Sequence, residues 1–124
     1  MPNFLASANN IPVVEILTEN LNGVAVVSLK GRLDINTHGQ LETELNALAG
    51  KGQTKVLIDV KDLDYISSAG LRVLLTAAKQ FKKINGTIAL AALAPTVRQV
   101  FEISGFATIF ALYPSREEAL AKMK

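Results

Sequence analysis

The hydrophobic and polar positions along this chain follow two periodicities, one typical of strands and one typical of helices. Short apolar runs rich in β-branched residues predict five strands, over 13–18, 24–30, 55–60, 87–93 and 107–112. Asn22-Gly23 between the first two runs predicts a hairpin, because both residues tolerate positive φ. The nearly continuous run at 55–60 is typical of a central strand that is covered on both faces.

Apolar residues that recur three and four positions apart predict helices between these runs. We expect four helices, over 37–49, from Ser67-Ser68 to Asn85-Gly86, over 95–104, and from Ser115 onward. Possible capping boxes, Thr37 with Gln40 and Ser115 with Glu118, support the first and the last helix. The second helix is expected to present one apolar side, made of Leu71, Leu74, Leu75, Ala78 and Phe81.

The order of these elements predicts the fold class. From residue 55 onward strands and helices alternate, which requires crossover connections and mostly parallel strands. The expected fold is therefore α/β, with a mixed sheet of four or five strands and about four helices. We expect residues 1–12 to form a loosely held leader and residues 13–124 to form one domain.

Composition narrows the class of protein. The 124 residues include no cysteine, which excludes disulfides, thiolate nucleophiles and Cys-bound metals. The net charge of +2 is too small to favour direct binding of nucleic acid. The longest apolar runs are too short to span a bilayer, and the first residues do not follow the pattern of an export signal. We expect a cytoplasmic protein with no cofactor, no metal and no insertion into membranes.

Two adjacent serines, Ser67 and Ser68, are the main candidates for chemistry. They end a polar stretch, 61–68, which we expect to be the loop after the central strand. One serine is explained as a helix N-cap, which stabilises a helix by about 1 kcal/mol. The following Ala69-Gly70 step adds little bulk, so a hydroxyl here would be open to an enzyme and the first-turn amides would be open to an anion. We interpret the pair as a phosphoacceptor site.

Three segments in order carry a resemblance to a known family. They are GRLD at 31–34, SSAGLRVLL at 67–75 directly after the strand region that contains VLIDV, and APTVRQVFEISGF at 94–106. Together they resemble the STAS domain, particularly the single-domain bacterial anti-sigma factor antagonists, over roughly residues 13–122. The resemblance implies the same α/β fold.

The resemblance also implies a switch in regulation of transcription. In that family an anti-sigma factor that is also a serine kinase phosphorylates a serine at the start of the second helix, and a PP2C-type phosphatase reverses the reaction. The unmodified form binds the anti-sigma factor and frees the sigma factor. Alignment on Gly70-Leu71 implies Ser68 as the acceptor, and Asp34 matches an acidic residue that assists recognition. The implied docking surface consists of Asp34, Ser67, Ser68, Gly70 and Arg72.

Two departures from the family pattern leave alternatives open. Ser67 stands where the family usually has aspartate, and Ala69 stands where it has a second hydroxyl residue. Ser67 is therefore an alternative acceptor. Some STAS domains are never phosphorylated and act as adaptors in transport or signalling complexes, and in that case both serines would serve only the helix.

The sequence gives less support to two other functions, a hydrolase and a receiver domain. Ser68, the sole His38, and Asp34 or Asp59 could supply a hydrolytic triad, but the G-x-S-x-G motif is absent and a lone histidine is more often solvated. We expect no catalytic activity. Asp59 invites comparison with receiver domains, but the acidic pair that those domains need after the first strand is missing, so we expect an aspartate bonded to loop amides.

Basic residues follow one face of the predicted second helix. Arg72, Lys79 and Lys83 lie along it with Thr76 between them. The simple interpretation is a solvated face. The alternative is a contact with an acidic surface on a partner, which would make the association rate fall with salt.

Overall fold

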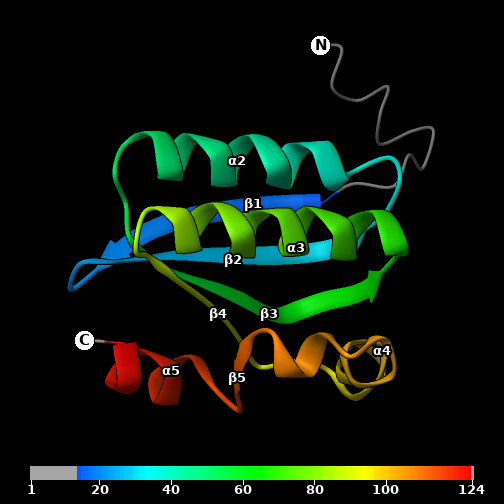
Figure 1. Ribbon diagram of the computed structural model, residues 1–124. Helices are drawn as coiled ribbons and strands as arrows, with labels where there is room; N and C mark the ends of the chain where they lie inside the picture. The colour runs from blue at the N-terminus through cyan, green and yellow to red at the C-terminus, as the bar shows by residue number, and fades with distance from the viewer. Residues whose placement is uncertain (1–13, 124) are drawn as a thin grey trace, which may run out of the picture.

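A five-stranded sheet with helices on both faces forms the centre of the molecule (Figure 1). The computed structural model describes residues 14–123, so the predicted leader lies outside the described residues. The elements are β1 (Val14–Leu21), β2 (Val24–Leu33), α2 (His38–Gly50), β3 (Lys55–Ile66), α3 (Ser68–Lys83), β4 (Thr87–Ala91), α4 (Pro95–Ser104), the 3-10 turn η1 (Phe106–Thr108), β5 (Ala111–Tyr113) and α5 (Arg116–Met123).

The sheet is mixed, with its strands in the order β1-β2-β3-β4-β5. β1 and β2 form an antiparallel hairpin whose turn holds Asn22 and Gly23 at φ of 55° and 84°. The β2–β3, β3–β4 and β4–β5 pairs are parallel. Residues 56–60 of the central strand β3 are all buried. The predicted α/β class, hairpin and central strand are confirmed.

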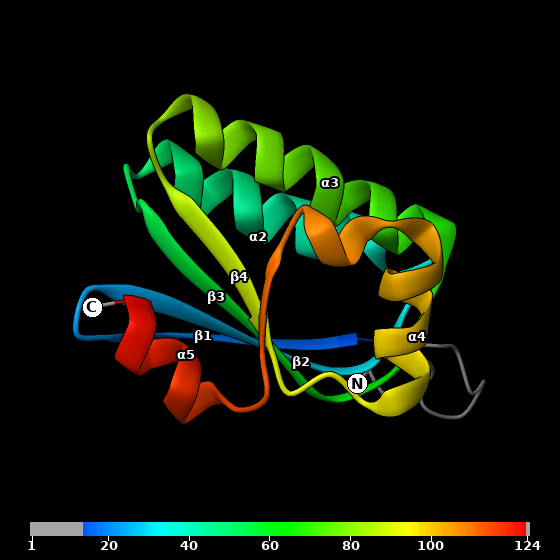
Figure 2. The same cartoon turned by 60° about the horizontal axis from the view of Figure 1, so that its bottom comes forward.

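Helices cover the two faces of the sheet unequally (Figure 2). α2 and α3 lie side by side on one face, and the larger core fills the space beneath them, with Val97 and Phe101 of α4 added at its margin. α5 packs on part of the opposite face. The smaller core there consists of Val24, Val26, Leu57, Ala89, Ala91, Ala119 and Met123.

The expected loop at 61–68 is wrong, because residues 61–66 continue β3. The strand stays paired with β2 through two register shifts, one between Ser28 and Lys30 and one between Gly31 and Arg32. Each irregularity changes which residues face the core, so Leu63 and Ile66 are both buried although they are three apart. Because of that spacing, residues 61–66 lack the strict alternation of apolar and polar positions by which a strand is recognised in a sequence.

The expected strand at 107–112 is also wrong over its first half. Residues 106–108 form η1, and β5 begins only at Ala111. Three phenylalanines explain the difference: Phe101, Phe106 and Phe110 pack with ring centroids 6.0–6.4 Å apart. The Phe110 N–H donates to the Phe106 carbonyl at 3.2 Å, so a helical turn brings the last two rings together. β4 is shorter than expected as well, because it ends at Ala91.

The helices largely follow the prediction. α3 buries Leu71, Leu74 and Phe81 as expected. It also buries Val73 and Ala77, since α2 packs beside it, and leaves Leu75 and Ala78 only partly covered. Ser115 caps α5 by accepting the Glu118 N–H at 3.1 Å.

α3 begins in close contact with the ends of β2 and β3. Gly70 is buried, and a Cβ atom placed there would lie 2.9 Å from Leu33 Cγ and 3.0 Å from Ile66 Cγ1. Ala69 is buried beside it. The small Ala69-Gly70 step therefore serves close packing, which corrects the expectation that it keeps the helix end open.

Substitution of Gly70 tests this packing. We expect Gly70→Ala to lower the free energy of unfolding by about 1–3 kcal/mol, because Leu33 and Ile66 must shift to admit the methyl group. Gly39→Ala is the matched control: nothing lies within 4 Å of its Cβ position in α2, so the change should be neutral or slightly stabilising. Urea unfolding measures both, and equal effects of the two substitutions would contradict the packing argument.

Candidate functional site

The two serines at the start of α3 have different roles. Ser67 is the N-cap residue: its Oγ accepts the Gly70 N–H at 3.3 Å, and its own N–H donates to the Leu33 carbonyl at 2.9 Å. Ser68 is the first residue of the helix and is exposed. The prediction that one serine caps the helix is confirmed for Ser67, which leaves the Ser68 hydroxyl outside the cap.

The first-turn amides are less available to an anion than expected. The Gly70 N–H is already taken by the Ser67 side chain, and the Leu71 N–H donates to the Ser67 carbonyl at 2.9 Å. A ready anion site at a helix start needs free N–H groups that point outward. The expectation of an open anion site is therefore wrong for Gly70, and the exposed feature here is the Ser68 hydroxyl.

Asp34 stands at the start of a tightly bonded turn after β2. Its N–H donates to Thr37 Oγ1 at 2.8 Å, and its Oδ1 accepts the Asn36 N–H at 2.9 Å. The single hydroxyl hydrogen of Thr37 faces the Arg32 carbonyl at 2.7 Å and Asp34 Oδ1 at 3.2 Å, and its oxygen accepts the Asp34 N–H, so the side chain makes no capping bond to α2. The predicted capping box of Thr37 with Gln40 is thus wrong, because the Asp34 turn uses the threonine instead.

The electrostatics of this turn favour a charged Asp34. Burial alone would raise the pKa of the carboxyl group, but hydrogen bonds from the Asn36 N–H and the Thr37 hydroxyl, together with the adjacent Arg32, outweigh it. The pKa of Asp34 therefore lies below its ordinary value. Arg32 Nε lies 3.5 Å from Asp34 Oδ2.

The structure brings most of the predicted docking surface to one end of the sheet. The hydrogen bond from the Ser67 N–H to the Leu33 carbonyl places the two serines next to the peptide that leads into Asp34. Gly70 lies beneath this surface rather than on it, and Asp34 is itself largely buried. Arg72 is exposed on α3, beside a small hollow that α2 and α3 share.

Comparison with known proteins identifies the family. The sequence model of the STAS domain matches residues 15–119. The chain belongs to the STAS domain family.

Several relatives of this STAS chain are named as anti-sigma factor antagonists. BtrV of Bordetella bronchiseptica, which carries the name of an anti-sigma factor antagonist, is 44% identical over 111 residues, covering 90% of this chain and 96% of BtrV. The anti-sigma-B factor antagonist of Bacillus subtilis is 31% identical over 91 residues, covering 73% of this chain and 82% of that protein. The crystal structure of an anti-sigma factor antagonist from Mycobacterium paratuberculosis, 28% identical, superposes with a TM-score of 0.82 and covers 89% of this chain and 93% of that one.

The residues of the disfavoured triad do not bond to one another in the described part of this STAS domain. His38 is half-buried rather than solvated, which corrects the expectation, and its buried Nδ1 has no hydrogen-bond partner within residues 14–123. A general base needs an acid that orients its ring. Within the same residues, no group of three His, Asp or Glu side chains could hold a metal ion, and no helix is long and apolar enough to cross a membrane.

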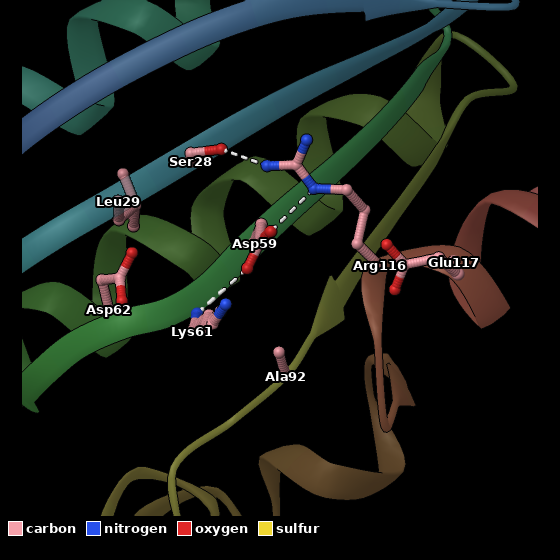
Figure 3. A pocket seen from close by; sticks show the side chains of 8 residues that line it. All are labelled: Ser28, Leu29, Asp59, Lys61, Asp62, Ala92, Arg116 and Glu117. Carbon is pink, nitrogen blue, oxygen red and sulfur yellow. Dashed lines mark hydrogen bonds and ion pairs between the residues drawn. The ribbon is translucent and has the colours of Figure 1, made fainter.

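Asp59 belongs to a polar network that the sequence did not predict (Figure 3). Its Oδ1 accepts the Lys61 N–H at 3.0 Å, which is the expected backbone amide bond, although Lys61 lies within β3 and not in a loop. Its Oδ2 accepts Arg116 Nε at 2.8 Å. Arg116 also donates to Ser28 Oγ at 2.7 Å and to Glu19 Oε2 at 3.3 Å. These bonds, first the one to Asp59, raise the pKa of Arg116 and tie α5 to three strands, beside a cavity of about 360 Å³.

Titration of Asp34 tests the electrostatics of the turn. We expect NMR of its carboxyl carbon to give a pKa below the value of about 3.9 for an unperturbed aspartate. Because the folded pKa is lowered, Asp34 contributes stability that is complete above the unfolded value and is lost as the pH falls through the folded value. Asp34→Asn should remove this acid-side loss. A midpoint at or above that of an unfolded peptide would contradict the hydrogen-bond assignment.

Removal of Arg116 tests the network around Asp59. Arg116→Met should lower the free energy of unfolding by about 1–3 kcal/mol, because the buried Asp59 carboxylate loses a charged donor. Arg98→Met on α4 is the control and should change stability by less than about 0.5 kcal/mol. Thermal or urea unfolding measures both. Equal effects would show that the Arg116 bonds add nothing to the attachment of α5.

Proposed function

We propose that this chain is an anti-sigma factor antagonist that switches partners when Ser68 is phosphorylated. The observation that carries the proposal is the exposed Ser68 hydroxyl at the first position of α3, outside the cap that Ser67 provides. The 44% identity to a relative named as an anti-sigma factor antagonist supports the same role. The proposal assigns this role to one non-enzymatic, cytoplasmic domain over residues 13–124.

In the proposed cycle the unmodified chain binds an anti-sigma factor that is also a serine kinase. The docking surface consists of Asp34, Ser67, Ser68 and Arg72, with Gly70 supporting it from beneath. Binding frees the sigma factor for transcription. The kinase then transfers phosphate to Ser68 and releases the chain, and a PP2C-type phosphatase restores the hydroxyl.

Geometry favours Ser68 over Ser67 as the acceptor. The Ser67 hydroxyl is half-buried and accepts the Gly70 N–H, so its modification would cost the cap about 1 kcal/mol of stability. The Ser68 hydroxyl has no such duty in the cap, and its exposure suits an approaching kinase. Modification there would leave the fold intact.

The charge of the phosphate explains how binding could be lost. A phosphoserine carries about −1.5 to −2 charges at neutral pH. At the start of α3 the helix dipole stabilises this charge by about 0.3–1 kcal/mol, so the free domain tolerates it. A partner that buried the same group without a counter-charge would lose several kcal/mol, on the order of a hundredfold or more in affinity.

A phosphorylation assay with single-serine variants tests the proposal. With ATP and the anti-sigma factor kinases of the source genome, purified one by one, we expect one of them to label the wild-type chain. Ser68→Ala should abolish the labelling because it removes the acceptor oxygen. Ser67→Ala is the matched control and should still be labelled, although its stability falls by about 1 kcal/mol.

Two other outcomes of the assay would change the acceptor or the function. Labelling that survives in Ser68→Ala and disappears in Ser67→Ala would move the acceptor to Ser67. A wild-type chain that none of the kinases labels or binds would contradict partner switching and favour an adaptor subunit of a transport or signalling complex.

A further inference from the structure

We propose that Ile35, together with the Arg32–Tyr65 pair, is the anchor by which the anti-sigma factor kinase holds this domain beside Ser68. The inference rests on the proposed function and names the contacts that the docking surface would use. Asp34 is largely buried, so other side chains must make most of the contact at its corner of the surface.

Ile35 is a strongly exposed apolar residue at this corner. It follows Asp34 directly, and 70% of its surface is open to solvent. A single exposed aliphatic side chain is common on proteins and needs no explanation by itself. What distinguishes Ile35 is the backbone that carries it.

Hydrogen bonds fix the turn on both sides of Ile35. The Asp34 N–H is bonded to Thr37 Oγ1 at 2.8 Å, and the Asn36 N–H is bonded to Asp34 Oδ1 at 2.9 Å. The His38 N–H donates to the Asp34 carbonyl at 2.9 Å. An exposed apolar group on a backbone that is already ordered loses little entropy when it enters a partner's pocket.

Arg32 and Tyr65 form a second exposed and ordered contact. The Arg32 guanidinium lies 4.4 Å from the centroid of the Tyr65 ring, and Arg32 Nε pairs with Asp34 Oδ2 at 3.5 Å. Tyr65 keeps 43% of its surface exposed. Arginine and tyrosine are enriched among the residues that dominate binding energy at interfaces, and the stacked pair is held in place before a partner arrives.

These contacts are continuous with the serines. Arg32 forms an ion pair with Asp34, and the peptide before Asp34 accepts the Ser67 N–H through the Leu33 carbonyl. The partner surface that fits has an apolar pocket for Ile35 and a carboxylate for the outer nitrogens of Arg32. None of these side chains carries the acceptor oxygen, so the anchor acts on substrate binding and not on the transfer step.

Alanine variants measured against a matched isoleucine test the anchor. The probe is the anti-sigma factor kinase that labels the wild-type chain. Ile35→Ala should weaken its binding at least about tenfold by calorimetry and raise the KM for labelling by a similar factor, with kcat unchanged. Tyr65→Ala should weaken binding in the same direction. The control is Ile84→Ala, at the opposite end of α3, about 24 Å from Ser68 along the helix axis. Ile84 is 37% exposed, and its variant should bind within about twofold of wild type.

The two proposals fail in distinguishable ways. If the wild-type chain binds its kinase and Ile35→Ala binds equally well, the anchor is refuted and the proposed function stands. If Ile35→Ala lowers kcat and leaves KM unchanged, the residue does not anchor the kinase, and the inference is again refuted. A wild-type chain that binds none of the kinases would overturn the proposed function, and the anchor with it. The thermal midpoint of Ile35→Ala should match that of wild type, since the side chain is mostly solvated.

Discussion

The hydrogen bond from the Ser67 N–H to the Leu33 carbonyl is the constraint on which the site depends. It joins the end of β2 to the start of α3, and Gly70 permits the approach because any side chain there would meet Leu33. Asp34 follows Leu33 and Ser68 follows Ser67, so one backbone bond places the acidic turn beside the candidate acceptor. The rest of the sheet and its helices hold the end of β2 and the start of α3 in place.

The two serines beside this hydrogen bond have separate roles in stability and in signalling. The Ser67 hydroxyl caps α3, while the neighbouring Ser68 hydroxyl is exposed. A modification of Ser68 thus changes the charge of the surface without removing a bond that holds the fold. The network around Arg116 includes none of the docking-surface residues and attaches α5 to the strands. Figure 3 shows its bonds to Ser28 and Asp59. This network stabilises the packing of α5 on the sheet and is not part of the docking surface.

Much of the fold could be predicted from the sequence, because local signals and global packing agree. The hairpin at Asn22-Gly23, the buried strand at 55–60 and the parallel order that follows are examples. The prediction failed where hydrophobic spacing does not show the deciding contact. β3 continues to Ile66 because bulges in its pairing with β2 shift its apolar side. Thr37 failed for a local reason, because its hydroxyl serves the neighbouring Asp34 turn instead of capping its helix. Arg116 pairs with a residue 57 positions away, which no spacing rule reveals.

The most direct test of the account compares the affinity and stability of the unmodified and Ser68-phosphorylated chains. Calorimetry with the same anti-sigma factor kinase measures binding, and thermal unfolding of each form measures the fold. Phosphate on Ser68 should lower the affinity about a hundredfold or more while the two melting midpoints stay within a few degrees. Equal affinities of the two forms, or a phosphorylated chain that unfolds, would contradict it.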